Sequence, residues 1–251
     1  MKLFLAMQFA IVFFVIQLIF TPALNAQESS SDKIASLKKL TEKIYGPDDV
    51  LINGKAHRQL LSDPESHPYF LSENWKQGSL IVNGDYFEDQ LLKYNLQLDK
   101  IILGHVDKTG TFSSTALNGQ FVSEFIIDHH HFIKINRLTS NSNVKGYVEL
   151  ITNQKLVFFV KHKKHYSIFR KSYEAGSDGK FYQNKPLYFI LYKGKVSRVA
   201  NQKSFLNYFA DHKKKIRQYI NRNNIDFRKA SSIQLKNLIE FCQTFLNPSD
   251  E

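Results

Sequence analysis

The residues most capable of chemistry in this chain are histidines, and they occur in two short clusters. The first cluster is His129-His130-His131. On one continuous strand, His129 and His131 would share a face, and two imidazoles at that spacing could bind a metal ion. The cluster lies between two strand-like runs, 125–127 and 132–135, so a hairpin turn with solvated histidines is at least as good an interpretation. No third ligand is evident, and we therefore predict no metal site.

The second cluster is His162-Lys163-Lys164-His165. Residues three apart on a strand point to opposite faces, so His162 and His165 cannot share one metal ion. The two lysines between them also repel a cation. We interpret this cluster as an exposed basic edge or turn, where lysines discourage pairing with the strands of other molecules.

Acidic residues raise the possibility of a hydrolase. Asp85, Glu88, Asp89 and Asp99 could supply the paired carboxylates of a glycosidase, but Asp85 and Glu88 flank a predicted hairpin and are most simply solvated. The chain has no Gly-x-Ser-x-Gly elbow, no His-Glu-x-x-His helix and no phosphate-binding glycine loop. We predict no catalytic residue and no cofactor. The alternative is an envelope hydrolase whose acids or histidines assemble only in the fold.

The cysteine content excludes several classes of protein. The one cysteine, Cys242, rules out a disulfide scaffold, a cysteine-rich zinc module and an iron–sulfur site. It follows Phe241 in a predicted helix, and we interpret it as a small buried apolar side chain. With 43% hydrophobic and 14% aromatic residues, the chain is also too apolar for wholesale disorder.

The charge distribution is the strongest functional indication. Residues 161–229 hold 18 Lys+Arg and 4 Asp+Glu, a net charge of 18 − 4 = +14, whereas the whole chain carries +11. A basic surface with interleaved aromatic residues attracts polyanions. We therefore predict binding of anionic polysaccharide or lipid headgroups, and the predicted binding residues are Lys213, Lys214, Lys215 and Arg217. The alternative is a solvated basic face over core aromatic residues.

The N-terminal residues predict export. Lys2 precedes an uncharged apolar run over residues 3–20, and Thr-Pro-Ala-Leu-Asn-Ala follows at 21–26. This is the layout of a secretory signal peptide over residues 1–26, which predicts a secreted or periplasmic envelope protein. An uncleaved membrane anchor is the competing interpretation. No later apolar run approaches that length, so we expect no transmembrane span after cleavage.

The periodicity of apolar residues predicts an α+β fold that is mainly β. Residues 27–46 form a linker and an amphipathic helix at 32–44, residues 47–200 an antiparallel β domain, and residues 201–251 a segment of three helices. In this last segment, Asp211 can cap a helix from Lys213 to Asn221, and Ser231 with Gln234 resembles a capping box at the start of the third helix. About ten strands are expected, in a meander, sandwich or open barrel. Asn-Gly pairs predict hairpins at 82–85 and 117–120, and Lys193-Gly194 predicts another. The run 156–160 lacks alternation and should be buried on both faces.

A set of short motifs made of turn and core residues is spread over nearly the whole mature chain. The motifs are Tyr45-Gly46, Asn53-Gly54, His67-Pro68-Tyr69-Phe70, Trp75-x-x-Gly78, Lys93-Tyr94-Asn95, Gly146-Tyr147, Lys203-Ser204-Phe205-Leu206 and Asp226-Phe227-Arg228-Lys229. Together they resemble a family of secreted proteins of unknown function found in Gram-negative bacteria. The resemblance implies a signal peptide, a β-rich middle and a helical tail, and it implies no catalytic or binding residue.

Overall fold

The chain divides into two compact units, residues 1–45 and 46–251. The computed structural model describes residues 33, 36–37, 48–58, 66–107, 109–170, 177–227 and 229–246. The predicted signal peptide, and the predicted helix at 32–44 apart from three residues, lie outside this described part. Those three residues, Lys33, Ser36 and Leu37, are helical, and the Ser36 hydroxyl donates to the Lys33 carbonyl.

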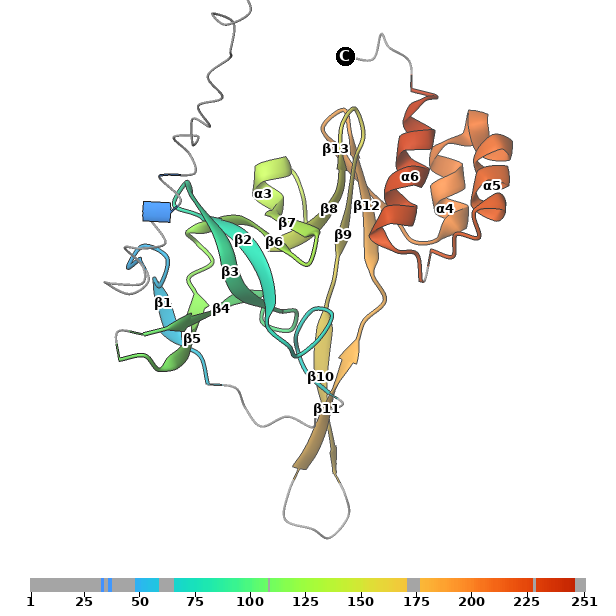
Figure 1. Cartoon of the computed structure of the whole chain (residues 1–251). Coiled ribbons are helices and arrows are strands. Elements are labelled where there is room, and N and C mark those ends of the chain that lie inside the picture. Colours follow the sequence, from blue (N-terminus) through green and yellow to red (C-terminus); the bar gives the residue numbers. More distant parts are fainter. Residues whose placement is uncertain are drawn as a thin grey trace, which may run out of the picture. The chain divides into compact units, whose positions relative to one another are not determined.

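The second unit is mainly β, as the period-two pattern predicts (Figure 1). Its strands are β1 (Gly54–Ala56), β2 (Lys76–Val82), β3 (Asp85–Asn95), β4 (Lys100–Val106), β5 (Phe112–Leu117), β6 (Val122–Ile127), β7 (His130–Lys134), β8 (Tyr147–Asn153), β9 (Val157–Lys161), β10 (Lys164–Arg170), β11 (Ser177–Gln183), β12 (Leu187–Tyr192) and β13 (Lys195–Val199). Its helices are α3 (Ile135–Leu138), α4 (Gln202–Tyr208), η1 (Ala210–His212), α5 (Lys213–Arg222) and α6 (Ser232–Gln243).

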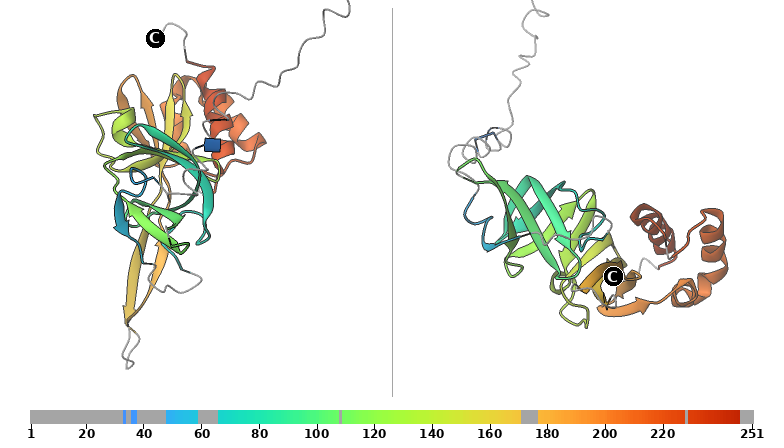
Figure 2. Two further views of the ribbon diagram at one scale, coloured as in Figure 1. Left: turned by 60° about the vertical axis from the view of Figure 1, so that its left-hand side comes forward. Right: turned by 90° about the horizontal axis from the view of Figure 1, so that it is seen from below.

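Eleven strands form one antiparallel sheet in the order β1-β5-β4-β3-β2-β6-β7-β8-β9-β12-β13, and the sheet is open. Strands β10 and β11 pair with each other in a separate two-stranded sheet that extends away from the rest (Figure 1). The helices α4, α5 and α6 gather beside β8, β9, β12 and β13 (Figure 2). The predicted fold class, a mainly β antiparallel protein with a C-terminal helical segment, is confirmed.

Two of the predicted hairpin turns are confirmed by their backbone angles. Asn83 and Gly84 join β2 to β3 with φ of 53° and 95°, and Lys193 and Gly194 join β12 to β13 with φ of 48° and 71°. Positive φ at both central residues gives the tight turn that matches the twist of a hairpin. The turn between β6 and β7 has the same form without a glycine.

The predicted hairpin at 117–120 is wrong. Strand β5 pairs with β4 and β1, whereas β6 pairs with β2 and β7, so the Asn118-Gly119 turn links strands that are not neighbours. Neither residue has a positive φ, and the Asn118 side chain accepts from the Gln120 amide instead. An Asn-Gly pair permits a tight hairpin but does not impose one, because the partners of the flanking strands decide the connection.

One apolar core lies where the first part of the sheet curls over itself. Strand β3 is separated from β8 by three strands in the sheet, yet the rings of Tyr94 and Tyr147 lie 6.2 Å apart. Phe125 and Phe132 fill the space between these rings. The remaining members of this first core come from β2 to β7 and the segments beside them: Leu51, Phe70, Leu80, Val82, Phe87, Leu92, Leu96, Ile101, Leu103, Leu117, Val122 and Ile127.

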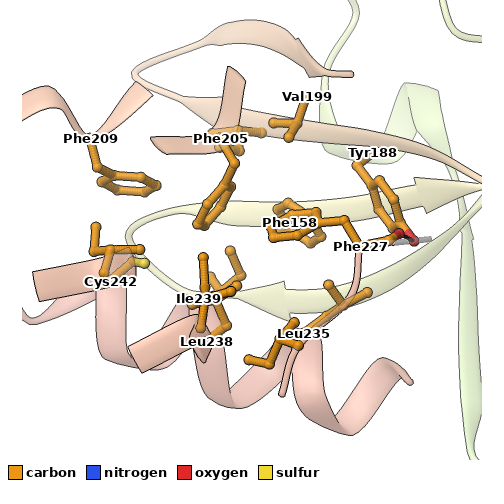
Figure 3. Close-up of a cluster of buried hydrophobic side chains, with 14 of the residues drawn as sticks. Phe158, Tyr188, Val199, Phe205, Phe209, Phe227, Leu235, Leu238, Ile239 and Cys242 are labelled. Atoms are coloured by element: carbon orange, nitrogen blue, oxygen red, sulfur yellow. Dashed lines mark hydrogen bonds between the residues drawn. The ribbon is translucent and has the colours of Figure 1, made fainter. Parts of the chain in front are cut away.

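A second core joins the sheet to the C-terminal helices (Figure 3). Phe158 and Val160 of β9 pack against side chains of all three helices, including Phe205, Ile216 and Leu238. On the opposite face of β9, Phe159 packs against Phe189 and Ile135. Strand β9 is therefore buried on both faces, which confirms the prediction from its missing alternation.

The helix starts follow local sequence signals with one exception. Ser231 and Gln234 form a reciprocal capping box at α6, as predicted, and Asn201 and Ser204 form another at α4. Helix α5 begins at Lys213, as expected, but its N-cap is His212, which makes no side-chain cap bond. The expectation that Asp211 caps α5 is wrong, because Asp211 lies in the middle of the 3-10 turn η1.

The Asn83-Gly84 turn generates a stability prediction. Gly84 has a φ of +95°, and a Cβ added to it would meet no atom within 4 Å, so Gly84→Ala tests backbone conformation alone. We expect the free energy of unfolding to fall by about 1 kcal/mol, because alanine resists positive φ. Gly119→Ala is the matched control: Gly119 has an ordinary φ and its Cβ would meet only the Tyr147 hydroxyl at 3.6 Å. Urea denaturation measures both, and equal midpoints would contradict the turn.

Candidate functional site

The most unusual group in the described part of the chain is the buried carboxylate of Glu149 on β8. Glu149 is 2% exposed and lies opposite Phe132 on one side and Val160 on the other. Phe132 belongs to the first apolar core and Val160 to the second. Glu149 therefore places a negative charge at the junction of two hydrophobic cores, where an unpaired charge would cost several kcal/mol.

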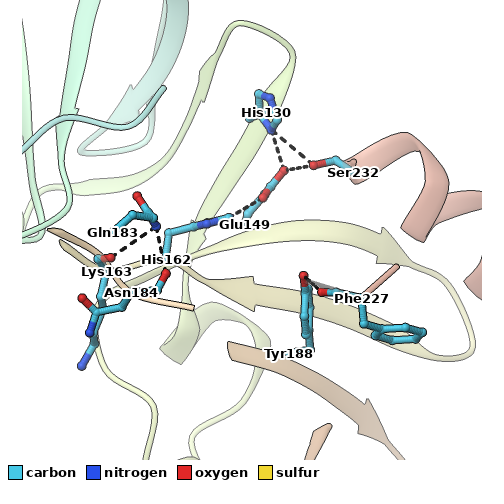
Figure 4. A network of polar contacts seen from close by, with 9 residues as sticks. All are labelled: His130, Glu149, His162, Lys163, Gln183, Asn184, Tyr188, Phe227 and Ser232. Atoms are coloured by element: carbon cyan, nitrogen blue, oxygen red, sulfur yellow. Dashed lines mark hydrogen bonds and ion pairs between the residues drawn. The ribbon is translucent and has the colours of Figure 1, made fainter. Parts of the chain in front are cut away.

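Three hydrogen-bond donors from three different segments satisfy this carboxylate (Figure 4). His130 Nδ1 at the start of β7 and Ser232 Oγ at the start of α6 each lie 2.6 Å from Oε1. His162 Nε2, in the link between β9 and β10, lies 2.6 Å from Oε2. The ring of Phe70 packs against both imidazoles, with centroids 5.0 and 5.2 Å away, and helps to shield the group from solvent. We call Glu149, His130, His162 and Ser232 the Glu149 centre.

The environment shifts the pKa values of this centre in opposite directions. Burial alone would raise the pKa of Glu149, but the hydrogen bonds from His130 and His162, the positive charge of His162 and the bond from Ser232 outweigh burial and lower it to about 2. The hydrogen bond to Glu149 raises the pKa of His130 above its ordinary value, against the effect of burial. The centre therefore favours an ionised carboxylate beside a protonated imidazole.

A serine, a histidine and a carboxylate suggest a hydrolytic triad, but the connectivity is different. In a triad, the serine bonds one imidazole nitrogen and the carboxylate bonds the other. Here the Ser232 hydroxyl and the carboxylate both face His130 Nδ1, at 3.4 and 2.6 Å, and Ser232 donates to Glu149 rather than to the imidazole. The carboxylate that accepts from Ser232 has a pKa lowered to about 2, which makes it a weak general base for this hydroxyl. The arrangement fixes the first turn of α6 to the sheet.

The structure corrects the interpretation of the first histidine cluster. The predicted turn is present, and Asp128 and His129 occupy it with φ of 49° and 68°. His130 and His131 do not lie at a solvated tip, because they begin β7 and are half-buried. His131 Nε2 lies 2.8 Å from Glu124, and His130 bonds Glu149. The predicted turn is therefore correct, but the prediction that its histidines are solvated is wrong for His130 and His131, because carboxylates on neighbouring strands bond them.

The second histidine cluster is only partly the exposed basic edge that we predicted. Lys163 and His165 are exposed, as expected. His162 is half-buried and bonds Glu149, and Lys164 is half-buried with its Nζ donating to the His67 carbonyl. The interpretation is therefore wrong for these two residues, because buried acceptors outside the cluster bind them.

A second ion pair, between the buried Lys161 and the half-buried Asp99, holds the other side of the curled sheet. Lys161 at the end of β9 is 5% exposed, and its Nζ donates to Asp99 Oδ2 at 3.0 Å and to the Tyr147 carbonyl at 2.8 Å. The Tyr94 hydroxyl donates to the other oxygen of Asp99. A Cβ on Gly146, which has a φ of +75°, would lie 1.5 Å from this carboxylate, so only glycine fits there. Asp99 thus ties the β3–β4 turn to β8 and β9.

The other acidic residues do not assemble a paired-acid site with Asp99. Asp85 and Glu88 are exposed, as the hairpin prediction implies, and Asp89 is exposed as well. Glu88 and Asp89 line a shallow cleft of about 540 Å³ together with Asp128, His129 and Tyr86. Asp99 lies instead in the ion pair with Lys161.

The predicted polyanion-binding residues lie together at the start of α5. Lys214, Lys215 and Arg217 are exposed, and Lys213 is half-buried with its Nζ 3.0 Å from Asn207 Oδ1. Lys215 Nζ lies 5.7 Å from the centre of the Phe245 ring. Among the residues that the structure describes, no acidic side chain forms an ion pair with any of the four.

Cys242 is fully buried in the second core, as predicted, and burial raises the pKa of its thiol to about 12. Among the described residues, no group of three or more His, Cys, Asp or Glu side chains is arranged to hold a metal ion. Within the same residues, no helix combines the length and apolarity needed to cross a membrane.

No protein-family model, no curated protein and no solved structure matches this chain. The resemblance to secreted Gram-negative proteins therefore stays a prediction.

Sequence reasoning did not single out Glu149 or the role of Ser232. One signal was present: Glu149 is the only charged residue of β8, and its neighbours Tyr147, Val148, Leu150 and Ile151 are not charged. A charge in a strand that is buried on its flanks requires partners, but the sequence does not say which donors reach it. His130, His162 and Ser232 lie 19, 13 and 83 residues away from Glu149 in the chain.

The Glu149 centre predicts the dependence of stability on pH. The folded-state pKa of Glu149 is lowered from 4.5 to about 2, so its contribution is present above pH 4.5 and is lost as the pH falls toward 2. The pKa of His130 is raised from 6.5, so its contribution is present below pH 6.5 and is lost as the pH rises through the folded-state value. We expect both contributions together between about pH 4.5 and 6.5. In this pH range, Glu149→Gln should lower the free energy of unfolding by about 2 kcal/mol. It should also weaken the pH dependence of the free energy of unfolding on both the acidic and the basic side of the range.

Glu124→Gln is the matched control for this measurement. Glu124 also bonds a histidine, His131 at 2.8 Å, but their side chains are 26% and 37% exposed. A partly exposed pair of this kind contributes only about 1 kcal/mol, because solvent screens it. Chemical denaturation of the wild type and both variants across the pH range gives the comparison. A Glu149→Gln profile parallel to that of the wild type would refute the assignment.

Proposed function

We propose that this protein is an exported, non-catalytic envelope protein that binds acidic polymers or lipid headgroups through the exposed face of α5. The observation that carries the proposal is the cluster of cations at the start of this helix. All five charged residues of α5 are basic, and they are Lys213, Lys214, Lys215, Arg217 and Arg222. A basic amphipathic helix is a common element in proteins that bind anionic surfaces.

The packing of α5 supports a binding role for its outer face. Ile216 and Ile220 are buried in the second core, and the ring of Tyr219 stacks on Phe241 of α6 at 4.3 Å. These apolar groups pack α5 on α4 and α6. Lys214, Lys215 and Arg217 are exposed and are therefore available to a ligand, whereas Lys213 already bonds Asn207 on α4.

The position of the lysines within the helix points the same way. Helix α5 has no acidic residue in its first turn and no side-chain cap, although a helix N-terminus already carries partial positive charge. Three consecutive lysines at this end reduce the stability of the helix. An approaching anion would relieve the repulsion, which supports an anionic ligand as the reason for the cluster.

The export component of the proposal rests on the N-terminal sequence. Lys2, the uncharged run 3–20 and Ala26 support cleavage of a signal peptide, and the resemblance to secreted Gram-negative proteins supports an envelope location. We expect mass spectrometry of the exported protein to find a mature N-terminus near Gln27. An intact Met1 terminus would refute export by this route.

The competing function, an envelope hydrolase, has less support. Glu149, His130 and Ser232 combine a carboxylate, an imidazole and a hydroxyl, but their hydrogen bonds hold the hydroxyl on the carboxylate. The geometry of this centre favours a structural role over nucleophilic catalysis.

Replacement of the four predicted residues tests the binding function. We expect the Lys213/Lys214/Lys215/Arg217→Gln variant to bind heparin and phosphatidylglycerol vesicles about tenfold or more weakly at low salt, since each cation near an anionic surface contributes about 1 kcal/mol. Wild-type binding should itself weaken as salt rises, because surface charges are screened over about 8 Å at physiological ionic strength. Elution from heparin and cosedimentation with vesicles give the measurement.

A second quadruple variant separates position from net charge. Lys55, Lys100, Lys145 and Lys195 are exposed and lie outside α5, and their replacement by Gln changes the net charge by the same amount. We expect this control to bind nearly as well as the wild type. If both variants lost the same affinity, net charge rather than the position of the cations on α5 would explain the binding. If the wild type did not bind at low salt, the proposed function would be refuted.

A further inference from the structure

The β10–β11 ribbon is the part of the second unit that is least explained by the stability of the fold. Among the described strands, β10 and β11 pair only with each other, over seven residue pairs from Lys164–Gln183 to Arg170–Ser177. An isolated two-stranded ribbon is at best marginally stable in water. Figure 1 shows the ribbon extending away from the large sheet and the helices. We call residues 163–170 and 177–185 the arm.

The base of the arm is held by the chain just before β2. The Phe181 amide donates to Ser66 Oγ, and Lys164 Nζ donates to the His67 carbonyl at 3.0 Å. These bonds fix the direction in which the arm leaves the sheet.

Large apolar side chains are exposed on the arm. The register places Tyr166 opposite Phe181 and Ile168 opposite Gly179. The Tyr166 ring packs on Phe181 at 4.9 Å and lies over Gly179, where a Cβ would approach its Cζ to 2.2 Å. Tyr166 is nevertheless 42% exposed and Ile168 61% exposed. On the opposite face, Tyr182 stacks on His165 and is 44% exposed. Large apolar groups are therefore exposed on both faces.

The net charge of the arm indicates which kind of partner its exposed apolar groups bind. It contains the basic residues Lys163, Lys164, Arg170, Lys180 and Lys185 and the acidic residue Asp178, so its formal net charge is 5 − 1 = +4. Tyrosines and an isoleucine among basic residues suit the interface of an anionic bilayer, where aromatic rings sit at headgroup depth and lysines meet lipid phosphates. We propose that the arm inserts into the headgroup region of an anionic lipid bilayer.

The depth of insertion follows from the backbone. The outer edges of β10 and β11 have amide and carbonyl groups that no other described strand pairs with. Such groups require water or polar headgroups and cannot enter the hydrocarbon region. The arm therefore lies at the interface and does not span the bilayer. A second copy of the chain is a poorer occupant, because its arm carries the same net positive charge.

The proposal rests on the proposed function, since it takes the anionic surface bound by α5 to be a membrane. The two differ in what they require. Binding by α5 requires cations and extends to heparin, whereas the arm requires exposed apolar side chains and a bilayer. A substitution in the arm that spares heparin binding therefore separates the two.

Ile168→Asp is the test variant, and Ile233→Asp is its matched control. Ile233 lies on α6 and is 72% exposed, so both changes replace an exposed isoleucine and add the same negative charge. The full chain is tested by cosedimentation with vesicles of phosphatidylcholine and phosphatidylglycerol and by elution from heparin. We expect Ile168→Asp to weaken vesicle binding about tenfold and to leave heparin elution equal to that of Ile233→Asp. Equal unfolding midpoints confirm that both variants fold.

A tryptophan placed in the arm reports insertion directly. In Ile168→Trp, we expect addition of phosphatidylglycerol vesicles to shift the tryptophan fluorescence emission to shorter wavelength and to protect it from quenching by iodide, while the wild type, with Trp75 alone, changes less.

The proposal is overturned if Ile168→Asp binds vesicles as well as Ile233→Asp does, or if Ile168 mediates a concentration-dependent dimer with vesicle binding unchanged. Wild-type binding to heparin but not to vesicles overturns the arm proposal alone, whereas binding to neither overturns both.

Discussion

The buried carboxylate of Glu149 is the constraint on which the joining of sheet and helices depends. An ionised group between two apolar cores is tolerated only when its hydrogen-bonding capacity is filled. The donors come from β7, from the β9–β10 link and from the first turn of α6, so these segments must meet at one point. Apolar packing alone would allow α6 to slide along β8, because hydrophobic contacts are not directional. The hydrogen bond from Ser232 gives this helix a defined position.

The Asp99–Lys161 pair applies the same principle to the curvature of the sheet. The first core brings the faces of β3 and β8 together through Tyr94, Phe125, Phe132 and Tyr147, and the ion pair then fixes the β3–β4 turn against β9. The two polar centres lie on adjacent residues of the same stretch, since Lys161 takes part in one and His162 in the other. The end of β9 is therefore the point where the curled sheet, the helical layer and the start of the arm are held together.

This arrangement explains why the positive charge of residues 161–229 is not a single surface. Lys161 forms an internal ion pair with Asp99, and Lys164 donates to the His67 carbonyl at the base of the arm. Other basic residues of this range lie on α5 and on the arm, which are different elements of the second unit. A helix with exposed cations suits any anionic ligand, whereas cations mixed with exposed aromatic and aliphatic groups suit a lipid interface. The division of the charge is what allows the two elements to be tested separately.

Local signals in the sequence were sufficient for the class of fold and for many of its elements. Alternation and turn residues predicted the strands and the hairpins at Asn83-Gly84 and Lys193-Gly194, and the Ser231 capping box located α6, because each of these depends on residues a few positions apart. The Asn118-Gly119 turn and the Glu149 centre could not be obtained in this way. Strands β5 and β6 are not neighbours, because β6 pairs with β2 whereas β5 pairs with β4. His130 and His162 are shielded from solvent because they bond a carboxylate on another strand. Only the tertiary structure brings such distant groups together, because the free energy that pairs them arises from burial of the whole sheet and not from any single segment.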